Sequence, residues 1–209
     1  MFAAVACTVE RAFGGVKYVY RGIKREDGNS QSGVRLSCGI DYTGSGPTDM
    51  DGNSAALPGK NNSLKYLAEG LAGKGIASLR YDKRGIASSA SAGKDEYSMR
   101  FEDGIKDARG WIDYLSRDKR ISGIYVLGHS EGALVGMAAS VDNPKVKGYI
   151  SVAGAGRPAY EIVEEQMAGQ PEVIRDMVKS INASLKEGKL VPDVRSAYNP
   201  CSVRQYSLI

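Results

Sequence analysis

Histidine is almost absent from this chain: among its 209 residues there is one, His129. Cysteine is sparse too, and Cys7, Cys38 and Cys201 form an odd number at wide, irregular spacings. Such spacings are typical neither of a disulfide framework nor of a zinc site. We therefore expect free thiols in a reducing compartment, a cytoplasmic location, and no bound metal or other cofactor.

Long apolar runs and charge of one sign are also missing. No run reaches the roughly 18 apolar residues that a membrane-spanning helix needs, so we expect no membrane span. The 28 Lys and Arg residues against 24 Asp and Glu leave a formal charge of +4 that is spread along the chain. A nucleic-acid binder gathers its basic residues on one surface, so we expect no nucleic-acid partner. No pattern in the sequence indicates an oligomeric state.

The composition, with 42% hydrophobic and 25% charged residues, is that of an ordinary globular protein. Short apolar segments typical of strands alternate with segments of helical spacing, a pattern that predicts βαβ units and an α/β fold with a mostly parallel sheet and flanking helices. The expected strands are 34–40, 76–81, 121–127 and 146–152, and the expected helices begin near 63, 101 and 131.

The two ends of the chain depart from this alternation. We interpret residues 1–33 as an irregular N-terminal segment, in which the polar, turn-rich stretch 21–33 is a loop or an irregular hairpin. Pro158 and Pro171 can each begin a helix, and no strand pattern follows them. The predicted organisation is an irregular segment at 1–33, an α/β core at 34–156, a helical cap segment at 157–190 and a tail at 191–209.

The motif Gly128-His129-Ser130-Glu131-Gly132 carries the clearest chemistry. It is G-x-S-x-G directly after a predicted strand and before a predicted helix, the context of a nucleophile elbow. A side chain at Gly128 or Gly132 would collide with the neighbouring backbone, and the helix N-terminus favours negative charge developing beside Ser130. A glycine-rich turn with a chance serine is the alternative.

A second glycine-rich segment, Gly44-Ser-Gly-Pro-Thr-Asp-Met-Asp-Gly-Asn53, follows an early strand. Such a loop can aim a backbone N–H at an oxyanion, and by position the N–H of Ser45 would act with that of Glu131. Gly44 and Gly46 would give the loop its turns. A plain turn or a phosphate loop are the alternatives, although no Gly-Lys-Ser/Thr follows as in a Walker loop.

In chain order, the glycine-rich segment 44–53, Tyr81-Asp-Lys-Arg-Gly85 and the motif at 128–132 together resemble the α/β-hydrolase superfamily, in particular the bacterial carboxylesterases near the serine aminopeptidase type. The resemblance covers roughly residues 34–205. It implies a serine hydrolase that cleaves short acyl esters through an acyl-enzyme on Ser130, under a helical cap. It also implies that Asp82 and Arg84 hold a loop near the site by ion pairing, although a solvated charged turn would explain them equally well. Where the family has a further glycine, this chain has Ala87.

The triad is incomplete. In this superfamily the acid and the histidine follow the serine, yet no histidine follows Ser130, and His129 beside it must point elsewhere. We therefore expect a C-terminally truncated hydrolase that is inactive alone, with an exposed apolar patch where cover is missing. A non-catalytic pseudo-hydrolase that binds small molecules is the alternative.

Overall fold

The computed structural model describes residues 12–13, 16–21, 36–42, 45–55, 57–74, 76–93, 99–119, 121–189 and 191. Gly44, Cys7, Cys201 and nearly all of the predicted tail lie outside the described residues. The chain divides into two compact units, residues 1–154 and 155–209, and each is presented by itself. Within the described ranges, no helix is both long enough and apolar enough to span a membrane.

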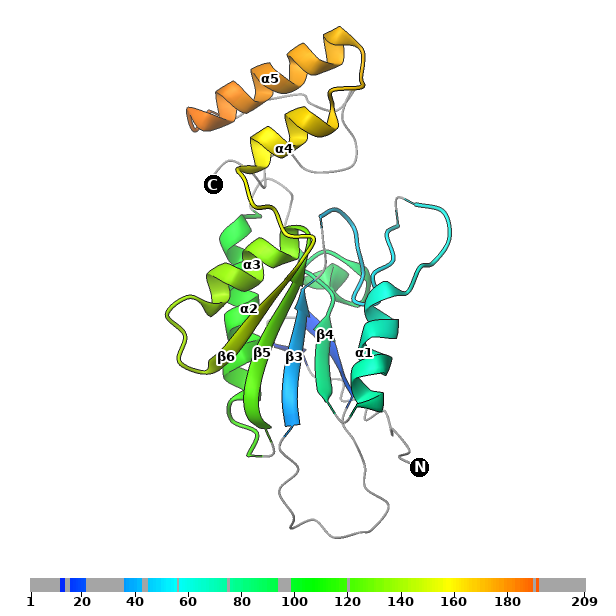
Figure 1. Cartoon of the computed structure of the whole chain (residues 1–209), viewed down its shortest axis with the longest axis vertical. Helices are drawn as coiled ribbons and strands as arrows, with labels where there is room; N and C mark the ends of the chain where they lie inside the picture. Colours follow the sequence, from blue (N-terminus) through cyan, green and yellow to red (C-terminus); the bar gives the residue numbers. More distant parts are fainter. Residues whose placement is uncertain are drawn as a thin grey trace. The chain divides into compact units, whose positions relative to one another are not determined.

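The first unit is built on a twisted sheet whose described strands run in the order β1-β2-β4-β3-β5-β6 (Figure 1). β3 lies parallel to β4 and β5, and β5 lies parallel to β6, whereas β2 is antiparallel to β4. The expected α/β fold with a mostly parallel sheet is confirmed. The strands are β1 (Ala12–Phe13), β2 (Val16–Arg21), β3 (Leu36–Tyr42), β4 (Ala77–Tyr81), β5 (Ile121–His129) and β6 (Val146–Val152).

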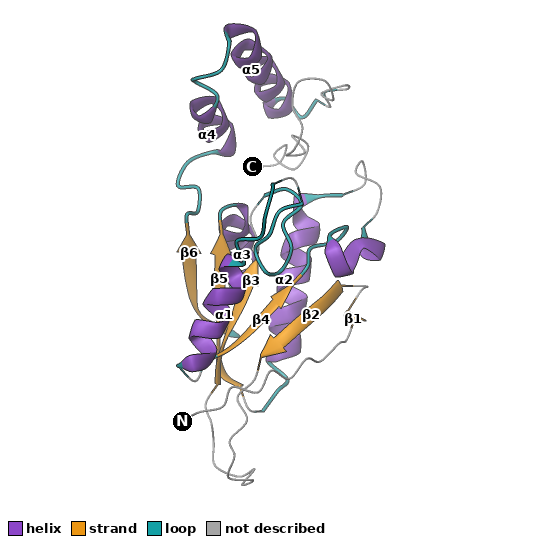
Figure 2. Cartoon of the chain, turned by 90° about the vertical axis from the view of Figure 1, so that its right-hand side faces the viewer, coloured by secondary structure: helices purple, strands orange, loops and turns teal. Residues whose placement is uncertain are grey.

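The interpretation of residues 1–33 as irregular is wrong for β1 and β2. These strands form a short hairpin, and β2 extends the sheet by pairing with β4 from Tyr18–Tyr81 to Arg21–Ser78 (Figure 2). The segment Val-Lys-Tyr-Val-Tyr-Arg of β2 is rich in β-branched and aromatic residues, which favour strands. Its turn-rich sequence neighbours hid this signal. The sheet therefore begins well before residue 34.

Helices cover both faces of this sheet. Ala77, Leu79 and Tyr81 of β4 join the main apolar core, in which Trp111 of α2 contacts Tyr81. α3 packs on β5 and β6 beside α2, and α1 packs on β4. Since side chains alternate along a strand, Ser78 and Arg80 of β4 point to the face opposite this core. The helices are α1 (Ser63–Gly73), the 3₁₀ helix η1 (Ala87–Ala92), α2 (Phe101–Leu115) and α3 (Glu131–Ser140).

The face opposite α2 and α3 is only partly covered. The register places Tyr125 of β5 opposite Gly148 of β6, and places Ile150 and Val152 on the same face. Tyr125, Ile150 and Val152 are 39%, 47% and 39% exposed, whereas Ile124 and Val126 on the other face are buried. These partly exposed apolar side chains lie on the β5–β6 half of this face, and the expected large exposed apolar patch stays a prediction.

The second unit contains α4 (Ala159–Gln166) and α5 (Glu172–Lys186). Pro158 and Pro171 lie at the N-caps of these helices, which confirms that each proline precedes a helix. Val178, Ile181 and Leu185 of α5 are buried and lie at helical spacing, so they form one apolar face of the helix. The assignment of this unit as a cap stays a prediction.

Candidate active site

Ser130 lies on the turn between β5 and α3, where φ is 55° and ψ is −121°. A non-glycine residue adopts these angles only under strain of about 1–3 kcal/mol, which the surrounding structure must hold in place. Its N–H donates to the carbonyl of Val152 in β6 (2.9 Å), and its carbonyl accepts from the N–H of Ala133 (3.0 Å). Both bonds fix the turn, and the predicted strand–serine–helix geometry is confirmed.

The glycine before the serine is required sterically. A Cβ atom on Gly128 would lie 2.1 Å from the carbonyl oxygen of Gly132 and 2.5 Å from the Cα of Ala133. Real Cβ atoms do not approach backbone so closely, so β5 and α3 can cross here only because Gly128 has no side chain. The close crossing points the first turn of α3 at the end of β5.

The glycine-rich loop begins beside this turn. Tyr42, the last residue of β3, is the register partner of Gly128, so the chain leaves β3 next to the elbow. The carbonyl of Ser45 accepts from the hydroxyl of Thr48 (3.1 Å), and the carbonyl of Gly46 accepts from its N–H (2.8 Å). Gly46 has φ 72°, a left-handed conformation that suits glycine. The convergence of the Ser45 and Glu131 N–H groups on one point stays a prediction.

The far half of the loop is tied to α1. The carbonyl of Asp51 accepts from the N–H groups of Leu64 and Lys65 (3.1 and 3.3 Å) and so occupies the exposed donors at the helix start. The side chain of the N-cap residue Asn62 makes no capping hydrogen bond to this helix. Asn62 sits at the N-cap with φ 49° and exchanges hydrogen bonds with Asn53 instead.

Three side chains at the C-terminal end of β4, or directly after it, bind the glycine-rich loop through hydrogen bonds and an ion pair. Arg80, 3% exposed, pairs with the carboxylate of Asp51 at 2.8 Å. Asp82 accepts the N–H of Met50 at 2.7 Å, and Lys83 donates to the carbonyl of Gly46 at 2.9 Å. The sequence reasoning missed Arg80 and Lys83. An arginine within the otherwise uncharged strand Ala-Ser-Leu-Arg-Tyr was the available signal for Arg80.

The ion pairing expected of Asp82 and Arg84 takes a different form. Arg84 forms a two-pronged pair with Asp107 of α2, at 2.6 and 2.7 Å. Asp82 is 1% exposed and its carboxylate accepts from the N–H and the hydroxyl of Ser88 as well as from Met50. Charge-assisted bonds of this kind fix backbone at two separate places, so Asp82 joins the glycine-rich loop to the start of η1. The solvated-turn alternative is wrong for both residues.

Ala87 adopts φ 41°, within the left-handed region that favours glycine. This is the position where the family resemblance led us to expect glycine. The strained turn brings Ser88 to the Asp82 carboxylate. The exposed methyl group of Ala87 therefore adds strain at a turn that the site uses.

The residues flanking the serine differ in environment. His129 is exposed at the end of β5. Glu131 begins α3, where helix geometry leaves N–H groups without intrahelical acceptors, so its N–H is suited to bind an oxyanion. Its Oε2 atom is buried, with no hydrogen-bond partner among the described residues. Among these same residues no cluster of His, Cys, Asp and Glu could hold a metal ion.

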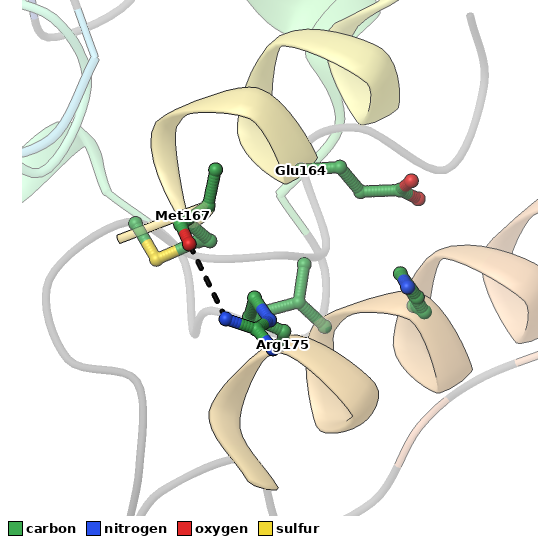
Figure 3. Close-up of a pocket in the computed structure, with 6 residues that line it drawn as sticks. Glu164, Met167 and Arg175 are labelled. Carbon is green, nitrogen blue, oxygen red and sulfur yellow. Dashed lines mark hydrogen bonds between the residues drawn. The ribbon is translucent and has the colours of Figure 1, made fainter. Parts of the chain in front are cut away.

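A pocket of about 260 Å³ lies between α4 and α5 in the second unit (Figure 3). Arg175 of α5 donates to the carbonyls of Ala168 (3.4 Å) and Gln170 (3.2 Å), and so closes the turn between the helices. Elsewhere in this unit, a hydrogen bond from Arg157 to Glu165 raises the pKa of that guanidinium above its ordinary value. The pocket is lined by Glu164, Met167, Ala168, Arg175, Val178 and Lys179.

Comparison with known proteins assigns the chain to a family. The family model described as "Serine aminopeptidase, S33" matches residues 60–204, well over half of the chain. The chain belongs to this α/β-hydrolase family. Esterase EstD of Thermotoga maritima is 36% identical to this S33-family chain over 125 residues, which are 59% of the chain and 28% of EstD.

Solved α/β hydrolases share the fold of the S33-family chain. GrgF of Penicillium sp. sh18 has a TM-score of 0.53 at 19% identity, over 83% of this chain and 51% of GrgF. Est1E of Butyrivibrio proteoclasticus, solved with ferulic acid bound, has a TM-score of 0.51 at 21% identity, over 72% of this chain and 54% of Est1E. The Pyrococcus furiosus esterase PF2001 has a TM-score of 0.51 at 19% identity, over 86% of this chain and 61% of PF2001. The chain thus spans about a quarter of EstD and 51–61% of these three structures.

Proposed function

We propose that Ser130 is the nucleophile of a carboxylesterase-type serine hydrolase. The observation that carries the proposal is the strained backbone of Ser130 (φ 55°, ψ −121°) between β5 and the N-terminus of α3. Strain of this kind gathers at functional sites, because only a special turn presents a short side chain outward at the end of a strand.

In the proposed reaction the Ser130 hydroxyl attacks the ester carbonyl carbon while a base removes its proton. The carbonyl oxygen becomes an oxyanion that accepts hydrogen bonds from the N–H groups of Ser45 and Glu131, at the positive end of the α3 dipole. Collapse releases the alcohol, which takes up a proton, and leaves an acyl group on Ser130. Water then attacks this acyl-enzyme and releases the carboxylic acid.

The base in this scheme is a histidine other than His129. His129 directly precedes the serine at the end of β5, and its side chain is exposed, so the proposal does not use it as the base. The proposed active protein therefore brings a further histidine, and an acid that orients it, to the Ser130 hydroxyl. In this proposal, residues 45–131 contribute the nucleophile and the two N–H groups of the oxyanion hole.

The proposed substrates are small carboxylic esters. EstD and PF2001 are named as esterases, and Est1E is described with ferulic acid, a small aromatic acid. In this proposal α4 and α5 form the cap that selects the acyl group. A small-molecule-binding protein without catalysis is the second candidate. It is favoured because the 209 residues contain no histidine other than His129, which the proposal does not use as the base.

Chemical rescue separates the two candidates. We expect the 209-residue chain to hydrolyse a short-chain nitrophenyl ester very slowly, because the oxyanion hole and binding alone leave an effect of roughly 10³–10⁴ over water. Added imidazole, which can replace a missing histidine base, should raise a rate component that Ser130→Ala removes. Equal rates for the chain and Ser130→Ala at every imidazole concentration would refute the nucleophile and favour the binding protein.

A further inference from the structure

Among the lysines of the first unit whose burial the structure describes, Lys83 stands out because it is buried. The residue is 9% exposed, and its ammonium donates to the backbone carbonyl of Gly46, 37 positions earlier in the chain, at 2.9 Å. Removing an ammonium group from water is costly unless its hydrogen bonds are replaced. The buried Lys83 ammonium binds the backbone of the glycine-rich loop. Its burial costs free energy, and its hydrogen bond restricts the conformation of that loop.

The carbonyl that Lys83 holds lies one residue after Ser45. The peptide oxygen of Gly46 also accepts the N–H of Thr48, and the oxygen of Ser45 accepts the Thr48 hydroxyl. Both peptide planes on the C-terminal side of the Ser45 N–H are therefore fixed by hydrogen bonds. Gly46, at φ 72°, has no side chain to restrict it, so the turn depends on these bonds for its orientation.

Different residues at the end of β4 bind different halves of the glycine-rich loop. Arg80 binds Asp51 and Asp82 binds the N–H of Met50, so both act on its distal half. Lys83, which follows β4, contacts the first half of the loop through its hydrogen bond to the Gly46 carbonyl, beside Ser45. Arg80, Asp82 and Lys83 all lie at the C-terminal end of β4 or directly after it. The position of the loop therefore depends on this end of β4.

We propose that Lys83 is a positioning residue that orients the Ser45 N–H by holding the Gly46 carbonyl. The catalytic consequence rests on the proposed function, in which that N–H binds the oxyanion. Displacement of an oxyanion donor weakens transition-state binding more than substrate binding, so loss of Lys83 lowers kcat with little change in KM.

The test compares three variants. Lys83→Met removes the ammonium and keeps the apolar stem, and Lys83→Arg keeps a charged donor. Lys145→Met is the matched control. Its ammonium pairs with Asp113, and it precedes β6, at the opposite end of the parallel strands from the loop. Each variant is measured for thermal unfolding, for the backbone amide resonance and hydrogen exchange of Ser45, and for imidazole-rescued hydrolysis.

We expect Lys83→Met to shift the Ser45 amide resonance and speed its exchange while the Glu131 amide stays unchanged. Rescued kcat should fall about 10- to 100-fold with KM within about threefold, and Lys83→Arg should recover part of it. An unmoved Ser45 amide, or a moved amide with unchanged kcat, overturns the proposal. If rescue by imidazole is absent in the unsubstituted chain, the proposed function fails, and the Ser45 amide alone then decides whether Lys83 positions it.

Discussion

Replacement of Ser130 by glycine should make the protein more stable. The residue holds φ 55° and ψ −121°, at a strain of about 1–3 kcal/mol for a residue with a Cβ atom. Glycine tolerates these angles but loses about 0.5–1 kcal/mol more conformational entropy on folding. The Ser130 side chain makes no capping hydrogen bond to α3, so little else is lost. The net expectation is a gain of about 1 kcal/mol.

The measurement is urea and thermal unfolding of the chain, Ser130→Gly and Ser130→Ala. For a chain of this length, about 1 kcal/mol corresponds to a rise of roughly 2–4 °C in the melting temperature. Ser130→Ala removes the same hydroxyl but keeps the Cβ atom, so it should melt close to the unsubstituted chain. If Ser130→Gly melted no higher than Ser130→Ala, the strain argument, and with it the main support for the nucleophile, would fail.

Three further substitutions probe the surroundings of the site by urea unfolding. Gly128→Ala should destabilise by about 3 kcal/mol or more, because its Cβ would lie 2.1 Å from the Gly132 carbonyl oxygen; a loss under about 1 kcal/mol would contradict the close crossing. Ala87→Gly should stabilise by about 0.5–1 kcal/mol, because the exposed methyl group is lost and φ 41° is relieved; a loss of stability would show that the turn is unstrained. Asp82→Asn should cost about 2–3 kcal/mol, since a buried carboxylate that accepts from Met50 and Ser88 becomes neutral, whereas exposed Asp176→Asn should change stability by less than about 0.5 kcal/mol.

Local sequence patterns predicted the elements of the parallel half of the sheet. β6 has the predicted bounds, α3 begins at the predicted residue, and β5 differs only in extending to His129. The elbow could be predicted because its cause is local: two glycines, a serine and a strand-to-helix change lie within a few residues. β2 was missed although its residues favour strands, because turn-rich neighbours hid this signal and its partner β4 lies about 60 positions later in the chain.

Three features follow from local sequence or composition alone: the strand–serine–helix turn at Ser130, the helices after Pro158 and Pro171, and the lack of any histidine besides His129. Each follows from composition or from steric rules that act over a few residues. The contacts that hold the glycine-rich loop, in contrast, join residues far apart in the chain and are visible only in the folded structure. Lys83 and Gly46 are 37 positions apart, and Met50 and Asp82 are 32 apart. Such pairs form because β3 and β4 end at the same edge of a parallel sheet, and no periodicity along the chain encodes which side chain will meet which backbone group there.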